Sequence, residues 1–145
     1  MKFVVLALLM LSPLANAAQW TPLGENDFGA FYVDKATITQ SDDLIQVDTL
    51  LNWVEPHPLP GNDTKTYQSE VALAYLDCKN NELAFGSRTM YTDTNGMGHV
   101  VFNIDLTLND VRLRASSAGS TGEQLIKSVC PKPPQTSALA PNTKK

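Results

Sequence analysis

The sequence has 145 residues, with 11 lysines and arginines against 15 aspartates and glutamates, so its formal net charge is −4 at pH 7. This length fits one ordinary domain. The negative balance argues against nucleic acid as a partner, because phosphate binding needs clustered basic residues, and it also disfavours anionic lipid surfaces.

The first 17 residues have the pattern of a secretory signal. Lys2 supplies a positive start, residues 3–11 are an uncharged apolar run, and residues 15–17 read Ala-Asn-Ala. Small residues at these positions are what a signal peptidase recognises. We therefore predict a signal peptide over residues 1–17, cleaved between Ala17 and Ala18, and a periplasmic or secreted mature protein.

The chain contains two cysteines, Cys78 and Cys130, and neither lies near the predicted cleavage site. We therefore expect no lipid attachment and no stable membrane anchor. In an oxidising compartment, two cysteines allow one intramolecular disulfide, Cys78 to Cys130. It would close a loop of about 53 residues and stabilise the fold by roughly 4 kcal/mol. A metal or redox site is the weaker alternative, because there is no C-x-x-C and no histidine at ligand spacing.

Apolar residues recur at spacing two, which indicates sheet. A short strand is predicted at residues 31–33, ended by Asp34 and a Lys-Ala-Thr turn. Residues 44–53 alternate strictly, which predicts one buried and one solvated face. The proline-rich residues 56–61 then predict a stiff, exposed loop.

Three further strands are predicted at residues 64–78, 82–92 and 100–106, joined by turns at 79–81 and at the Asn-Gly-containing 93–96. The first has two apolar faces, so we expect it to be central. In the second, simple alternation puts Leu83, Phe85 and Tyr91 on one face and Arg88 on the other.

One helix is predicted after Ser120 and Glu123, which form a capping box. Its apolar face should lie on the sheet, with Cys130 as its last residue. The fold class is therefore α+β, a mainly antiparallel sheet of about five to six strands with one C-terminal helix and one disulfide. The predicted domain covers residues 18–130, and the Pro, Ser, Thr and Lys-rich residues 131–145 are predicted to be a disordered tail.

Recognisable catalytic motifs are absent from the sequence. There is no G-x-S-x-G, no H-E-x-x-H and no phosphate-binding glycine loop. The two histidines, His57 and His99, lie far apart in the chain, and the acidic pair Asp42-Asp43 has the character of a solvated turn. We expect no enzyme, no cofactor and no metal site. A deep pocket holding a histidine beside a carboxylate would favour an enzyme instead.

Aromatic residues and prolines gather around residues 53–67, where they would make a rigid contact surface. Trp53, His57 and Tyr67 are the candidate partner-binding residues. The alternative for Trp53 is a core position, because it continues the inward face of its strand. A local basic patch is a further candidate, although nearby carboxylates would neutralise it. Its members would be Lys79, Arg88, Arg112 and Arg114.

The order of several short motifs resembles one family. The motifs are Trp20, Phe31-Tyr32-Val33-Asp34, the strand at 44–53, Tyr67-Gln68-Ser69, Asp77-Cys78, Ser120-Thr121-Gly122-Glu123-Gln124-Leu125 and Val129-Cys130. In this order, and with this cysteine pair, they are similar to the surface-adhesin E family of Gram-negative bacteria. The resemblance runs from Trp20 to Cys130, nearly the whole predicted domain.

The resemblance implies an exported antiparallel sheet with one packed helix and a helix-to-sheet disulfide. Founding members resemble lipid-anchored outer-membrane adhesins that bind host proteins such as vitronectin, laminin and plasminogen, and that can bind haem. This chain departs by lacking a lipid-attachment cysteine, by having only Lys79 after the first cysteine, and by lacking a tryptophan before the final helix. No binding residue is carried over beyond the two cysteines.

We therefore expect a non-catalytic exported module that binds a protein partner, with host extracellular-matrix or serum proteins as candidates. The alternative is a periplasmic envelope or assembly factor, or a small inhibitor protein. A homodimer formed by pairing of exposed sheet edges is also plausible.

Overall fold

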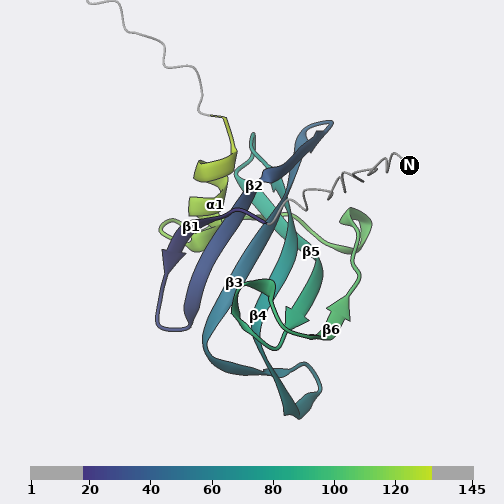
Figure 1. Ribbon diagram of the computed structural model, residues 1–145. Helices are drawn as coiled ribbons and strands as arrows, with labels where there is room; N and C mark the ends of the chain where they lie inside the picture. The colour runs from purple at the N-terminus through teal and green to yellow at the C-terminus, as the bar shows by residue number, and fades with distance from the viewer. Residues whose placement is uncertain (1–17, 132–145) are drawn as a thin grey trace, which may run out of the picture.

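The computed structural model describes residues 18–131 and consists of one antiparallel sheet with a single α-helix packed on it (Figure 1). Consecutive strands pair in the order β1-β2-β3-β4-β5-β6, and the short β7 pairs with β5. The strands are β1 (Trp20–Glu25), β2 (Gly29–Ser41), β3 (Leu44–Leu59), β4 (Asn62–Asp77), β5 (Glu82–Tyr91), β6 (Val100–Ile104) and β7 (Arg114–Ala115). The helices are α1 (Thr121–Val129) and two 3₁₀ turns, η1 (Thr94–Gly96) and η2 (Leu108–Asp110).

The expected α+β class is confirmed, with a seven-stranded sheet where five to six strands were predicted. The predicted signal peptide lies outside the described residues, as do residues 132–145 of the predicted tail. Within the described part of the chain, no helix is long and apolar enough to cross a membrane.

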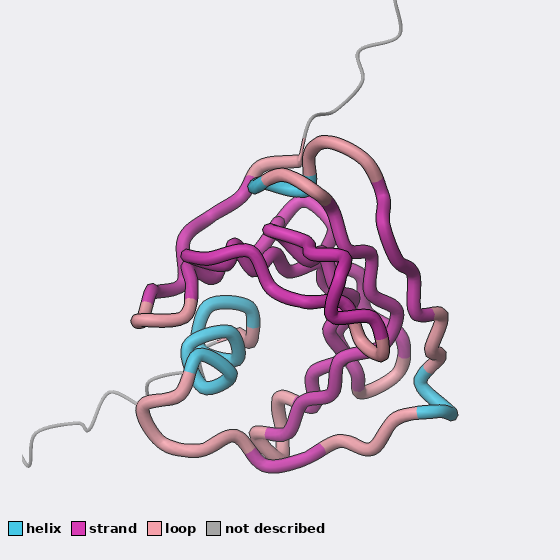
Figure 2. Tube along the Cα trace, turned by 90° about the horizontal axis from the view of Figure 1, so that it is seen from below, coloured by secondary structure: helices cyan, strands magenta, loops and turns pink. Residues whose placement is uncertain are grey.

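The sheet curls around α1, so that the helix lies against its concave face (Figure 2). Leu125 and Ile126 of α1 are buried there, as the predicted amphipathic pattern requires. The strand residues buried in the same apolar cluster are Val33, Ile45, Val47, Ala74 and Leu76. Burial of this face closes the core between the helix and the sheet.

The N-cap of α1 is the residue that the sequence predicts, but only half of the predicted capping box forms, and the helix ends at Val129. The Ser120 hydroxyl accepts a hydrogen bond from the Glu123 amide at 3.2 Å, which is the expected N-cap. The Glu123 carboxylate accepts from the Gly119 amide at 2.8 Å, one residue before the cap. Cys130 is the C-cap, and its disulfide to Cys78 joins the helix end to the end of β4, as predicted.

The predicted proline-rich loop is instead part of a long hairpin, because β3 runs on to Leu59. In it His57 pairs with Tyr67, after a register shift that follows Asn52. β2 pairs with β3 only as far as Trp53, so the part of β3 that follows Trp53 has a free edge on the side of β2. Proline cannot donate a ladder hydrogen bond but is tolerated at such an edge, which is why residues 56 and 58 do not end the strand.

The strand predicted at 31–33 is also longer than expected. The Asp34 carboxylate accepts from the Ala36 amide at 3.0 Å, and the Thr37 hydroxyl donates to the Asp34 carbonyl at 2.9 Å. These are turn contacts, but here they form an irregularity inside β2, whose pairing with β3 resumes at Thr39. The predicted turn hydrogen bonds therefore form at Asp34, but the prediction that the strand ends there is wrong.

A bulge in β5 corrects the predicted orientation of Arg88. Phe85 pairs with Ala74 and Arg88 pairs with Ala72, so β5 has one more residue than β4 between these two pairs. At Gly86 a Cβ would lie 2.7 Å from the Tyr75 ring and 2.9 Å from a backbone carbonyl, so only glycine fits there. The extra residue brings Arg88 to the same face as Phe85, where simple alternation put it on the opposite one.

The disulfide is expected to contribute much of the stability, because its cysteines are 52 residues apart in the chain. We predict that the Cys78→Ser/Cys130→Ser variant loses about 4 kcal/mol of unfolding free energy. Urea unfolding followed by circular dichroism measures this loss, with the reduced wild type as the matched control. An unchanged midpoint in both samples would contradict the prediction.

Candidate functional site

The three predicted partner-binding residues meet in one aromatic cluster at the start of the β3–β4 hairpin. The Trp53 and His57 rings stack with centroids 4.1 Å apart and planes 5° from parallel. Tyr67 meets both rings edge-on, at 6.2 Å from Trp53 and 5.8 Å from His57. His57 is exposed and Tyr67 is buried, so the imidazole forms the outer layer of the cluster.

The register shift in β3 builds this cluster, because it places His57 opposite Tyr67. Trp53 is half-buried and packs against the buried Leu59, Tyr67 and Met90, so it is in part the core residue that alternation predicts. The aromatic cluster is therefore held from below by the sheet and presents one ring to solvent.

An ion pair that the sequence did not reveal lies on the same face of the sheet. Arg88 Nη1 is 3.5 Å from Glu70 Oε1, and the two side chains are 37% and 11% exposed. The guanidinium also lies 6.0 Å from the centre of the Phe85 ring. Glu70 pairs with Met90 and Arg88 with Ala72 in the ladder, so only the bulge in β5 brings these two charges onto one face.

The carboxyl group of Glu70 is ionised less easily than usual. Burial raises the pKa of Glu70, and the nearby Arg88 and His57 act in the opposite direction without cancelling that effect. Burial and the nearby charge of Glu70 also raise the pKa of the Tyr67 hydroxyl. The aromatic cluster and the ion pair therefore form one electrostatically connected site.

A cavity of about 240 Å³ lies between α1 and this ion pair. Its walls are mainly apolar, and its charged groups are Glu70 and Arg88. The lining residues come from β1 to β5 and from α1: Leu23, Phe31, Tyr32, Thr49, Leu50, Leu51, Glu70, Ala72, Phe85, Arg88, Thr121, Gly122 and Leu125. Neither His57 nor His99 belongs to this lining, so the cavity is not the histidine–carboxylate pocket that would favour an enzyme.

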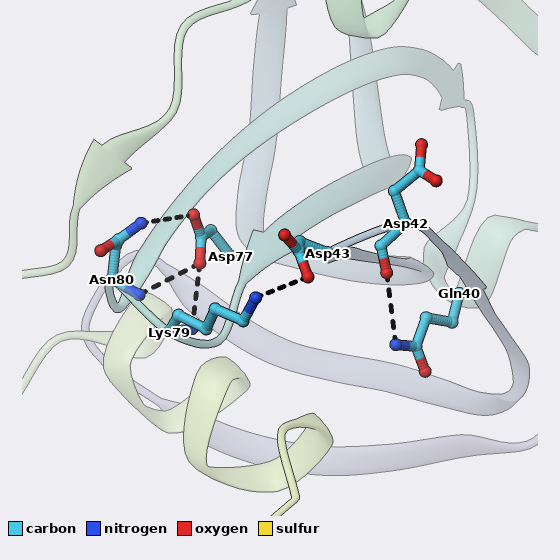
Figure 3. Close-up of polar contacts among 6 residues, drawn as sticks. All are labelled: Gln40, Asp42, Asp43, Asp77, Lys79 and Asn80. Atoms are coloured by element: carbon cyan, nitrogen blue, oxygen red, sulfur yellow. Dashed lines mark hydrogen bonds and ion pairs between the residues drawn. The ribbon is translucent and has the colours of Figure 1, made fainter.

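Other candidate groups from the sequence have structural partners. The exposed Lys79 pairs with Asp43 at 2.6 Å, and Asp77 accepts hydrogen bonds from the Lys79 and Asn80 amides at 2.9 and 3.0 Å (Figure 3). The Asn80 side chain donates to Asp77 as well, and these hydrogen bonds lower the pKa of Asp77. The contacts fix the β2–β3 and β4–β5 turns beside each other.

The predicted basic patch is therefore divided, since Lys79 and Arg88 each pair with a carboxylate while Arg112 and Arg114 are exposed near β7. Among residues 18–131 no three His, Cys, Asp or Glu side chains are grouped so that they could hold a metal ion.

The family model of surface-adhesin protein E matches residues 20–131. The chain belongs to this family. The sequence resemblance, which depended on the order of the motifs and on the cysteine pair, is thus confirmed. No curated protein sequence matches the chain significantly.

Solved structures of Haemophilus influenzae protein E share the fold. One matches with a TM-score of 0.58 and 15% identity, covering 83% of this chain and 90% of that chain. A second crystal form matches with a TM-score of 0.60 and 15% identity, over 85% and 96%. Protein E from a non-typeable strain matches with a TM-score of 0.56 and 15% identity, over 83% and 81%.

The raised pKa of Glu70 predicts a pH effect on stability. The folded state binds the Glu70 proton more tightly than the unfolded chain does. The contribution of Glu70 to the free energy of unfolding therefore falls as pH rises from the ordinary glutamate pKa through the raised value. Urea unfolding of wild type and Glu70→Gln from about pH 4 to pH 8 should show the wild type losing stability relative to the variant. A relative gain would mean that Arg88, rather than burial, controls this carboxyl group.

Proposed function

We propose that this member of the surface-adhesin protein E family is an exported, non-catalytic module that binds a protein partner. The proposed contact surface is the distal end, which we define as the β1–β2 turn, the β3–β4 hairpin and the η1 segment before β6. These parts lie at the end of the sheet opposite the α1 terminus that carries the disulfide (Figure 1). Extracellular-matrix and serum proteins are the proposed partners.

Exposed apolar side chains at the distal end are the observation that carries the proposal. Phe28 is 72% exposed and Val54 is 60% exposed, and the Val54 amide donates to the Phe28 carbonyl at 3.0 Å. Met97 and Val100 are also exposed, and Val100 pairs with Tyr91 near the same end of the ladder. Neighbouring apolar side chains left in water are typical of protein-contact surfaces.

The aromatic cluster supports the same surface. Stacking on Trp53 and the edge contact with Tyr67 hold the exposed His57 ring in place, so ordering it on binding would cost little entropy. Rigid aromatic groups beside apolar residues are the composition of contact residues that carry most of the affinity. A homodimer through the free edges of β1 or β6 remains a prediction.

The surface is tested with the exported protein immobilised for surface plasmon resonance against vitronectin, laminin and plasminogen. We predict that Phe28→Ser/Val54→Ser raises the dissociation constant of whichever partner binds about tenfold or more, which corresponds to about 1.4 kcal/mol of binding free energy. Ile38→Ser is the matched control, since Ile38 is an exposed apolar strand residue in β2, outside the distal end. Equal loss in both variants, or no loss in either, would exclude the distal end.

Export is tested separately by cell fractionation and mass spectrometry. We expect a mature protein that begins at Ala18, without lipid and with Cys78 bonded to Cys130. Detection of part of this protein outside the cell supports binding to host proteins. Confinement to the periplasm would instead favour an envelope or assembly factor, or a small inhibitor.

A further inference from the structure

The cavity between α1 and the ion pair is separate from the proposed contact surface. None of the exposed apolar residues of the distal end lines it, and its walls belong to the inner face of the sheet and to α1. An engineered cavity of about 150 Å³ lined by Leu, Ile and Phe binds benzene. A volume of about 240 Å³ therefore has room for an apolar group larger than one ring.

Arg88 supplies hydrogen-bond donors at this cavity that the protein itself does not use. Its one ionic contact within residues 18–131 runs from Nη1 to Glu70, and at 3.5 Å it is longer than a charge-assisted hydrogen bond. Nε is buried and has no hydrogen-bond partner among the described residues. The rest of the guanidinium is accessible, because the Arg88 side chain is 37% exposed, and a guanidinium is a strong donor to carboxylate oxygens.

The unpaired donor is unfavourable in the free protein, because a buried N–H without a partner retains its desolvation cost. Glu70 does not remove that cost, since it contacts the other side of the guanidinium. Nε itself has almost no accessible surface, so a ligand acceptor would reach the guanidinium at its accessible part, since the Arg88 side chain as a whole is 37% exposed. The site is thus a mainly apolar cavity with a cationic, partly unpaired group in its wall.

From these contacts we infer that the cavity binds a carboxylic acid with an alkyl chain, whose chain lies along Leu51, Phe85 and Leu125 and whose carboxylate pairs with Arg88. This is a small-molecule site, and it does not depend on the proposed protein partner.

The walls favour an alkyl chain over the end of a peptide. The Thr49 hydroxyl already donates to the Ala72 carbonyl at 2.9 Å, and most other lining groups are apolar. The amides of a peptide would therefore lose water there without finding partners, whereas an alkyl chain needs none. An alkyl amine has the wrong charge for Arg88, and an alcohol gains only a neutral hydrogen bond.

Isothermal titration calorimetry of the full exported protein with sodium octanoate tests the inference, with octanol and octylamine as matched probes. We expect saturable binding of octanoate about tenfold or more tighter than of either probe. Arg88→Gln should reduce octanoate binding by a similar factor, while Arg114→Gln, which removes an exposed charge outside the cavity, should leave it unchanged. Glu70→Gln should tighten octanoate binding, because a competing carboxylate is removed from the guanidinium.

Arg88→Gln leaves Glu70 buried without its partner and so also destabilises the fold, which is why a second variant that keeps both charges is needed. Ala72→Leu keeps both charges, fills the cavity and should abolish octanoate binding, with folding checked by circular dichroism. A peptide ending in a free leucine that binds better than octanoate would overturn the alkyl assignment. Equal binding of octanoate and octanol, octanoate binding unchanged in folded Ala72→Leu, or no saturable binding of octanoate would overturn the site itself.

Discussion

Packing of the apolar face of α1 inside the curled sheet is the contact on which the structure depends. Leu125 and Ile126 share one buried cluster with the apolar residues of β2, β3 and β4. The disulfide joins the C-terminal end of this helix to the end of β4, so the two layers are held together next to the β4–β5 turn. The opposite end is left for exposed side chains.

The inner face of the sheet combines two environments that normally exclude each other. Beside α1 it is an apolar core, and further along it holds the largely buried Glu70 paired with the more exposed Arg88. A buried ion pair rarely adds stability over apolar residues of the same size. It lies beside a cavity and an aromatic cluster, and ionisable groups with perturbed pKa values are common at functional sites.

Much of this fold could be predicted from the sequence, because its signals are local. Alternation at residues 44–53, the Ser120 cap and the single cysteine pair each act over a few residues or leave one choice. The predictions that were wrong or missing concern features that depend on contacts between residues far apart in the sequence. The hairpin passes through two prolines because β2 has already ended, and β1, which contains Pro22 and lies at an edge, gives almost no alternating pattern.

The candidate site was only partly predictable for the same reason. Trp53, His57 and Tyr67 were found because aromatic residues near prolines are visible in the sequence. The pairing of Glu70 with Arg88 was not, since it requires the bulge at Gly86, and that bulge is set by the Tyr75 ring and the chain after β6. An alternating apolar pattern does not show where a β-bulge inserts an extra residue into a strand.

Pairing between consecutive strands along the path from β1 to β6 also constrains the order in which the protein can fold. Each hairpin from β1 to β6 can form from neighbouring segments, so most of the sheet requires the closing of short loops only. Helix α1 is the exception, because it must reach back across the chain to contact β1 and β2. This topology allows the sheet to assemble before the disulfide forms, so an oxidant that acts late would suffice to complete the molecule.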